Sequence, residues 1–259
     1  MSLRLLHGRR LVRLLVHVVL AVLLIGGWEL AAARGWIDPF YVSRPSAIGG
    51  RVREWFASGT IWPHLRVTAT EALLALVLGL VLGLAAGFLC GRSRTVSALA
   101  GPYLKVLNSL PRVVLAPLFL IWFGLGIWSK VAFGVTLVFF VVFFNVYQGV
   151  RDVDPVLVEH VRMLGAGQAA LLRHVYLPSA LTWVFSSLHA GVGFALVGAV
   201  VGEYLGASEG VGYLISQAEG VLDTTGVFAG MAVLGALVMV IDLVTRGAER
   251  RLLRWKPSR

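Results

Sequence analysis

TATEALLALVLGLVLGLAAGFLC, residues 68–90, is the stretch that decides the fold. It is almost wholly apolar, and it is about as long as the ~20 residues that a helix needs to cross a membrane. Gly79, Gly83 and Gly87 recur in it at four-residue spacing, and Gly91 continues the row. On a helix this spacing places the glycines on one stripe, where another helix can pack closely. The stretch therefore predicts a tightly packed transmembrane helix, with a substrate passage along the stripe as the alternative.

Further apolar segments lie on both sides of this one. They are residues 14–33, 113–123, 131–147, 181–205 and 228–244, and a proline-broken approach over 102–111 precedes the second of them. A soluble domain that is 58% hydrophobic and 14% charged would aggregate. The sequence thus predicts an all-α polytopic membrane protein with about six transmembrane helices. We expect one transmembrane domain over residues 1–259, with its core at about 65–250.

The first apolar segment allows two interpretations. A basic start, an apolar middle and alanines at positions 31–33 are typical of a cleaved signal peptide. An even number of spans instead favours a retained anchor, which is the interpretation we prefer. Between the first two spans, residues 52–58 predict a short helix on the membrane surface, and the glycines of 206–212 predict a turn.

Lysine and arginine are concentrated in the two tails, in the turn 91–98 and in residues 151–178, whereas 206–227 contains none. The positive-inside rule then places both termini and residues 151–178 in the cytoplasm. The arginines of the first loop, residues 34–66, weaken that bias. Because the basic residues lie at segment ends, the net charge of +10 indicates topology and not nucleic-acid binding. The single cysteine, Cys90, provides no disulfide within the chain and no metal pattern.

Residues 151–178, RDVDPVLVEHVRMLGAGQAALLRHVYLP, form a polar island between apolar spans. Apolar residues recur in it at helical spacing, which predicts two short amphipathic helices broken near Gly165-Ala166-Gly167. Pro178 suits the first turn of the next span. The island could lie on the lipid surface or dock on a soluble partner, and composition alone does not choose between the two. The apolar positions are Val158, Val161, Leu164, Leu171, Leu172 and Val175.

The island resembles the cytoplasmic loop of bacterial ABC-importer permeases. That loop has the pattern Glu-Ala-Ala, three residues, Gly, and after a fixed interval a hydrophobic residue, any residue, Leu and Pro. Here Glu159-His160-Val161 occupies the triplet, Gly165 the glycine, Val175 the hydrophobic position and Leu177-Pro178 the end, without insertion or deletion. His160 and Val161 depart from the two alanines.

The resemblance covers roughly residues 36–255 and is closest to the nitrate/sulfonate/taurine branch of these permeases. It includes four further segments: SRPSAIGGRV (43–52), PLFLIWFGLGIWSKVAF (117–133), GVRDVDP (149–155) and VVGEYLGASEGVGYLI (200–215). It implies a type I ABC-importer permease in the bacterial inner membrane. The implied partners are a second permease subunit in a homodimer, a cytoplasmic ATPase dimer, an extracytoplasmic solute-binding protein and membrane lipid.

The same resemblance implies that the island 151–178 couples the permease to the ATPase. The residues expected to do so are Glu159, Arg162, Leu164, Gly165, Ala166, Leu177 and Pro178. No G-x-x-x-x-G-K-[ST] motif occurs in the sequence, so ATP and magnesium are expected on the partner ATPase and no cofactor on this chain.

Ionisable residues near the spans suggest further roles. Asn108, Arg112 and Glu203 are candidates for a translocation pathway. Lys105, Asn108 and Arg112 would share one face if residues 102–112 were helical, and snorkelling to headgroups is the favoured alternative. Glu203 could instead contact the binding protein or lie solvated at the interface.

Three other ionisable residues have simpler expectations. Lys130 is expected to reach external headgroups. His189 fits a hydrogen-bonded packing role better than metal binding. Asp242 is expected to pair with Arg246, four residues later on the same helix.

An ion-coupled secondary transporter is the alternative function, but it would need carboxylates inside the spans, which are nearly absent. An intramembrane enzyme would need a clustered nucleophile and base, or a metal site, and the sequence contains no such pattern. The resemblance favours a small, anionic solute. Nitrate, sulfonates, taurine, aromatic acids and vitamin-precursor heterocycles all remain open.

Overall fold

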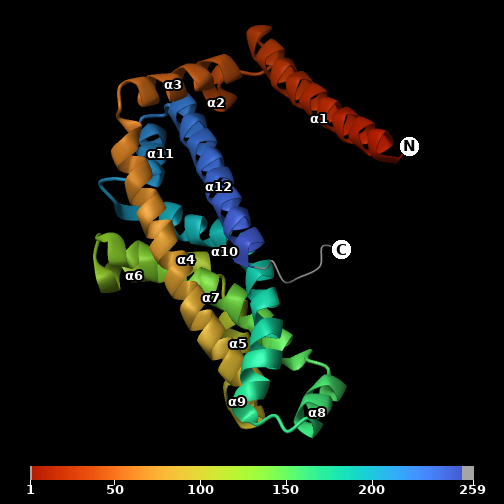
Figure 1. Ribbon diagram of the computed structural model, residues 1–259. Helices are drawn as coiled ribbons and strands as arrows, with labels where there is room; N and C mark the ends of the chain where they lie inside the picture. Colours follow the sequence, from red (N-terminus) through yellow and green to blue (C-terminus); the bar gives the residue numbers. More distant parts are fainter. Residues whose placement is uncertain (1, 253–259) are drawn as a thin grey trace. The chain divides into compact units, whose positions relative to one another are not determined.

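The computed structural model describes residues 2–252, without the side chains of 2–11, 13, 14, 177–182, 184–186 and 248–252. Every helix or strand assigned within 2–252 is a helix, which confirms the predicted all-α class (Figure 1). The elements are α1 (Ser2–Ala33), α2 (Pro39–Val42), α3 (Pro45–Ala57), α4 (Ile61–Arg92), α5 (Arg94–Ser109), η1 (Arg112–Leu115), α6 (Ala116–Phe123), α7 (Ile127–Arg151), α8 (Pro155–Met163), α9 (Gln168–Leu171), η2 (Leu172–Tyr176), α10 (Leu177–Gly206), α11 (Val211–Gly220) and α12 (Thr224–Leu252).

Five helices of the described chain are long and apolar enough to cross a membrane, and a bent pair makes a sixth candidate. The five are Leu15–Ala33, Ile61–Arg92, Ile127–Arg151, Ser187–Gly206 and Thr224–Gly247. They correspond to the predicted spans except the third. The predicted number of about six therefore depends on whether that bent pair crosses as one unit.

The predicted third span, residues 113–123, is not one straight helix. α5 and the η1–α6 segment meet at an angle of 85°, and α6 is only 8 residues long. The cause lies at Leu110-Pro111. A residue before proline is driven out of the helical region, and Leu110 has ψ 138°, so α5 ends at Ser109. Proline also cannot donate a hydrogen bond to continue the helix.

The chain divides into two compact units, which are described separately. The first unit contains residues 1–61 and 215–232, and the second contains residues 62–214 and the chain from 233 onward. The second unit contains most of α4, all of α5 to α10 and the greater part of α12.

The core of the second unit forms where α7 packs against α4 and α10. A Cβ atom on Gly83 would lie 2.8 Å from Val142 Cβ, and one on Gly91 would lie 2.8 Å from Val150 Cβ. Gly198 of α10 meets Gly134 of α7 in the same way. The glycine stripe of α4 is therefore a contact surface for α7, as predicted, and Gly198 allows a similarly close approach of α10 to α7. The buried core residues are Ala72, Ala75, Leu76, Val138, Val142, Val146, Val150, Val192, Ala195, Leu196 and Ala199.

The first unit contains a longer surface helix than predicted. We expected a helix over 52–58, whereas α3 begins at Pro45, where proline suits the first turn. The carboxylate of Glu29 in α1 accepts hydrogen bonds from the amide and hydroxyl of Ser46, at 2.9 and 2.7 Å. These bonds join the end of α1 to the start of α3.

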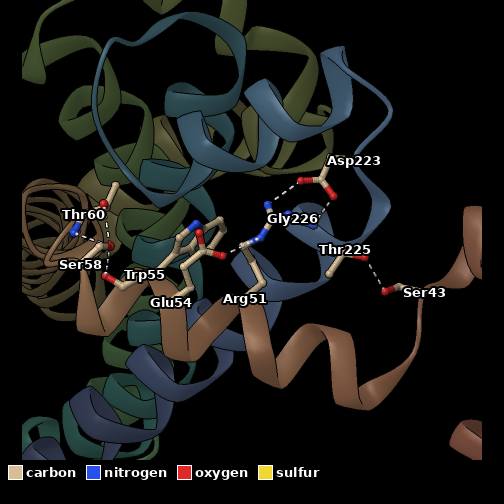
Figure 2. Close-up of polar contacts among 9 residues, drawn as sticks. All are labelled: Ser43, Arg51, Glu54, Trp55, Ser58, Thr60, Asp223, Thr225 and Gly226. Atoms are coloured by element: carbon tan, nitrogen blue, oxygen red, sulfur yellow. Dashed lines mark hydrogen bonds and ion pairs between the residues drawn. The ribbon is translucent and has the colours of Figure 1, made fainter.

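Polar contacts also join α3 and the segment before it to the first turn of α12 and the loop before it (Figure 2). Arg51 Nη1 lies 2.6 Å from Asp223 Oδ2, and the hydroxyls of Ser43 and Thr225 are 2.8 Å apart. Burial raises the pKa of Asp223, but hydrogen bonds from the Gly226 amide and the Arg51 guanidinium outweigh it and leave that pKa below its ordinary value. An ion pair and hydrogen bonds thus join segments of the first unit that are far apart in the sequence.

Candidate functional site

The island 151–178 folds into the two short helices that its pattern predicts. Asp154 caps the first one, because its carboxylate accepts from the Val156 amide at 2.8 Å, and Pro155 occupies the first turn. α8 ends at Met163, and the chain reverses at Gly165, whose φ is +84°. Glycine tolerates this left-handed conformation, and the predicted break of the island near Gly165 is confirmed.

One side of the paired helices is buried and the end of α8 is not. Val158, Leu171 and Val175 form a small buried cluster, which Val153 and Val161 cover. The predicted apolar stripe is interrupted at Leu164, because its exposed fraction is 86% and that of Met163 is 76%. α8 is consequently anchored through Val158 and Val161, and it presents two apolar side chains at its tip.

Four of the predicted coupling residues, Arg162, Leu164, Gly165 and Ala166, lie at or next to this tip. Glu159, Arg162, Leu164 and Gly165 are exposed, and Ala166 is half-buried. Glu159 and Arg162 also line one cavity of about 670 Å³. The side chains of Leu177 and Pro178 lie outside the described residues, although Pro178 belongs to the first turn of α10.

Asn108 and Arg112 lie at the bend between α5 and η1. They do not share a helical face as expected, because α5 ends at Ser109. Instead, the Arg112 guanidinium turns back, donates hydrogen bonds to the backbone oxygen and the side-chain Oδ1 of Asn108, and stacks over Phe140 at 4.5 Å. Arg112 is therefore held within the protein, and it forms no ion pair with a described carboxylate.

Glu203, the third pathway candidate, is 1% exposed and therefore not solvated at an interface. Its carboxylate accepts from the Thr68 hydroxyl at 2.6 Å and from the Gly212 amide at 2.7 Å. The Val211 amide in turn donates to Thr68 Oγ1 at 2.9 Å. Glu203 and Thr68 thus cap α11. This helix was not predicted, because the glycines of 206–212 indicated only a turn.

Two further ionisable side chains are buried beside Glu203. Glu71 is 2% exposed and Lys130 is 3% exposed. The expectation that Lys130 reaches headgroups is wrong, since its Nζ donates to the carbonyls of Leu125 and Gly126 at 2.5 and 3.2 Å. One sequence signal, a carboxylate in an apolar span, could have identified Glu71.

His189 and Asp242 meet across α10 and α12. His189 Nδ1 lies 2.7 Å from Asp242 Oδ1, and Arg246 Nη2 lies 2.8 Å from Asp242 Oδ2. The predicted pair of Asp242 and Arg246 is confirmed, and the hydrogen-bonded role of His189 is confirmed with it. Among the side chains that the structure describes, no group of three or more His, Cys, Asp or Glu residues could hold a metal ion.

Comparisons with known proteins agree with this geometry. Residues 75–254 match the model of a family described as "Binding-protein-dependent transport system inner membrane component". The chain is 32% identical to the "Putative aliphatic sulfonates transport permease protein SsuC" of Bacillus subtilis (strain 168), over 97% of this chain and 91% of that protein. It is 31% identical to the "Taurine transport system permease protein TauC" of Escherichia coli (strain K12), over 91% and 87%.

A third relative is named for a different solute. The chain is 32% identical to the "Riboflavin transport system permease protein RibX" of Chloroflexus aurantiacus, over 93% of this chain and 90% of that protein.

Among solved structures, one chain of the MetNI methionine ABC transporter matches with a TM-score of 0.57 and 19% identity, over 77% of this chain and 97% of that one. A chain of an amino acid ABC transporter matches with a TM-score of 0.58 and 21% identity, over 78% and 98%.

Proposed function

The chain belongs to the family of binding-protein-dependent transport system inner membrane components, and from this membership we propose that it moves a small anionic solute in an ATP-driven importer. In this proposal an extracytoplasmic binding protein delivers the solute. Two copies of the chain form the passage, and a cytoplasmic ATPase dimer that holds ATP and magnesium drives it. The chain itself catalyses no reaction.

The observation that carries the proposal is the exposed tip of α8. Met163 and Leu164 are 76% and 86% exposed, whereas Val158 on the same helix is buried. A groove on a partner can grip an apolar helix end of this kind, because burying it removes apolar surface from water. We infer that the ATPase provides the groove, and that closure of the ATPase dimer moves α8 as a rigid lever. Glu159 and Arg162 would add ion pairs at its rim.

The orientation follows from charge. Both tails and the island 151–178 are rich in arginine, whereas 206–227 has neither lysine nor arginine. With the positive-inside rule, both termini and α8 face the cytoplasm, where an ATPase can reach them. The end of α10 near Glu203 then faces the binding protein.

The preference for an anionic solute rests on Arg112. Its guanidinium lies at the bend of α5 and η1, over Phe140, and no described carboxylate neutralises it. A fixed positive charge beside a passage attracts anions and repels cations. Two of the relatives are named for sulfonates and taurine, which is consistent with this preference, although a third is named for riboflavin.

A single substitution at the α8 tip tests the proposed coupling. Leu164→Asp places a charge where an apolar contact is expected, so we predict loss of uptake together with loss of hydrolysis stimulated by the binding protein. The measurement is both rates in proteoliposomes that contain the permease and its ATPase. Val156→Asp is the matched control, because Val156 is 55% exposed at the other end of the same helix. Equal activity of the two variants would refute the role of the tip.

A further inference from the structure

Four arginines surround one cavity of the second unit, and the proposed function uses only one of them. The cavity has a volume of about 670 Å³ and lies between the junction of α4 and α5, the end of α7, and α8. Its basic residues are Arg92, Arg94, Arg151 and Arg162, and Glu159 is its one acidic residue.

The four guanidinium groups are poorly neutralised. Arg92 donates to Gln168 Oε1 at 2.6 Å and lies over the Tyr176 ring, and Arg151 donates to the Tyr147 hydroxyl at 2.5 Å. Arg94 and Arg162 have no hydrogen-bond partner among the side chains that the structure describes. None of the four forms an ion pair with a described carboxylate. Like charges collected around one space favour the entry of an anion.

A second cavity adjoins the first. It has a volume of about 440 Å³, and its walls are largely apolar, with Leu104, Phe143 and Phe144 among them. Cys90, Ser97 and Ala98 line both cavities. A basic space therefore continues directly into an apolar one, at the ends of two transmembrane helices, α4 and α7.

We propose that this pair of cavities binds an anionic phospholipid, with its phosphate on the arginines and an acyl chain in the apolar space. A free phosphate or sulfonate would satisfy the arginines but would leave the apolar cavity unused. Lipid headgroups also lie at the level where transmembrane helices end, so a lipid can enter without crossing water. With the proposed orientation the lipid comes from the cytoplasmic leaflet, whose anionic lipids attract basic segments. A lipid held there contacts both α8 and the ends of its supporting helices.

Native mass spectrometry of the full chain, purified with its ATPase, tests the proposal directly. We expect more phosphatidylglycerol than phosphatidylcholine to remain bound after exposure to equal amounts of each. Arg94→Gln/Arg162→Gln removes two charges that have no partner in the described structure, and should lower the preference about thirtyfold. Arg94→Lys/Arg162→Lys should retain most of it. The matched control is Arg53→Gln/Arg66→Gln, which removes two exposed arginines that lie outside both cavities.

A second variant distinguishes lipid from a free anion. A Cβ on Gly101, which lines the apolar cavity, would meet no described atom within 4 Å, so Gly101→Leu is the substitution chosen to fill that cavity. We expect it to lose phosphatidylglycerol while inorganic phosphate, monitored by thermal shift, still stabilises the protein. Equal retention of the two lipids by the unsubstituted protein would overturn the proposal. So would a preference that Arg94→Gln/Arg162→Gln leaves unchanged, or phosphate binding without any lipid preference.

Discussion

Gly165 links a backbone conformation to the proposed coupling. Its φ of +84° allows its own amide to donate to the Arg162 carbonyl at 2.9 Å, and the Ala166 amide to donate to Val161 at 3.3 Å. These are the two hydrogen bonds of a Schellman motif, which ends α8 and favours glycine at position 165. A non-glycine residue here is strained even though a Cβ would meet no described atom within 4 Å.

Substitutions at Gly165 should therefore separate strain from contact with the partner. We expect Gly165→Ala to cost about 1–2 kcal/mol in the turn and Gly165→Asn less. Gly165→Trp should abolish uptake while basal ATP hydrolysis continues, because a bulky side chain would obstruct the contact that is proposed to couple the ATPase to the permease. The ratio of uptake to hydrolysis in proteoliposomes measures this. Gly167→Ala is the control, since Gly167 has φ −74°. Normal uptake by the Trp variant would contradict the coupling role.

The pair of Glu71 and Glu203 predicts an asymmetric response to substitution. Glu203 accepts hydrogen bonds from Thr68 and Gly212, whereas Glu71 Oε2 has no partner among the described groups. Glu71→Gln keeps the shape of the side chain and removes no hydrogen bond seen among the described groups, so it should leave the melting temperature nearly unchanged. Glu203→Gln should lower it, because the amide NH2 group cannot accept one of the two hydrogen bonds, which costs about 1–3 kcal/mol. A larger loss for Glu71→Gln than for Glu203→Gln would contradict this prediction.

Among the elements, the contact of α4 with α7 allows the sharpest prediction. A Cβ on Gly83 would lie 2.8 Å from Val142 Cβ and 2.9 Å from the Phe139 carbonyl. Gly83→Ala must push the helices apart, and we expect a loss of about 1–3 kcal/mol, seen as a lower melting temperature in detergent. In Gly193→Ala the added Cβ meets no described atom within 4 Å, so this variant should be neutral or slightly stabilising. Equal effects would refute the close approach.

The bond between α3 and the loop before α12 predicts acid sensitivity in the first unit. Since the pKa of Asp223 is lowered in the folded protein, the unfolded chain binds the proton more tightly. The stabilisation is therefore complete above the unfolded pKa of about 3.9, and it is lost as the pH falls through the lower folded value. The difference in melting temperature between the unsubstituted protein and Asp223→Asn should be constant near neutrality and shrink on acidification. Glu54→Gln, at a side chain 71% exposed, should show little difference at any pH.

For the molecule as a whole, the sequence predicted those features that depend on a short stretch of residues. The length of the apolar segments predicted the spans, the four-residue spacing of glycines predicted the contacts of α4 with α7, and Gly165 predicted the break in the island. The bend at Leu110-Pro111 was not predicted. A proline in an apolar stretch indicates that the helix is interrupted, but it does not indicate an angle of 85° between the two parts. The sequence thus places the spans more reliably than it shows how they bend.

The buried polar contacts could not be predicted from one sequence, because they join residues that are far apart along the chain. Thr68 and Glu203 are 135 residues apart, and His189 and Asp242 are 53 apart. Such groups are brought together by packing, of α4 against α10 for the first pair and of α10 against α12 for the second. α11 was missed for the same reason, since the carboxylate that caps it belongs to α10. The residues proposed for the ATPase contact, by comparison, lie within one continuous segment that the pattern could identify.

The central claim, that the tip of α8 docks on the ATPase, can be measured by cross-linking. Cys90 is the single cysteine and is only 6% exposed, so Cys90→Ala gives a background free of thiols. Leu164→Cys and Val156→Cys are then introduced separately, and a short thiol-to-amine cross-linker is applied to the permease purified with its ATPase. We predict an adduct between permease and ATPase from position 164, and little or none from position 156. An adduct from position 156 without one from position 164 would contradict the account.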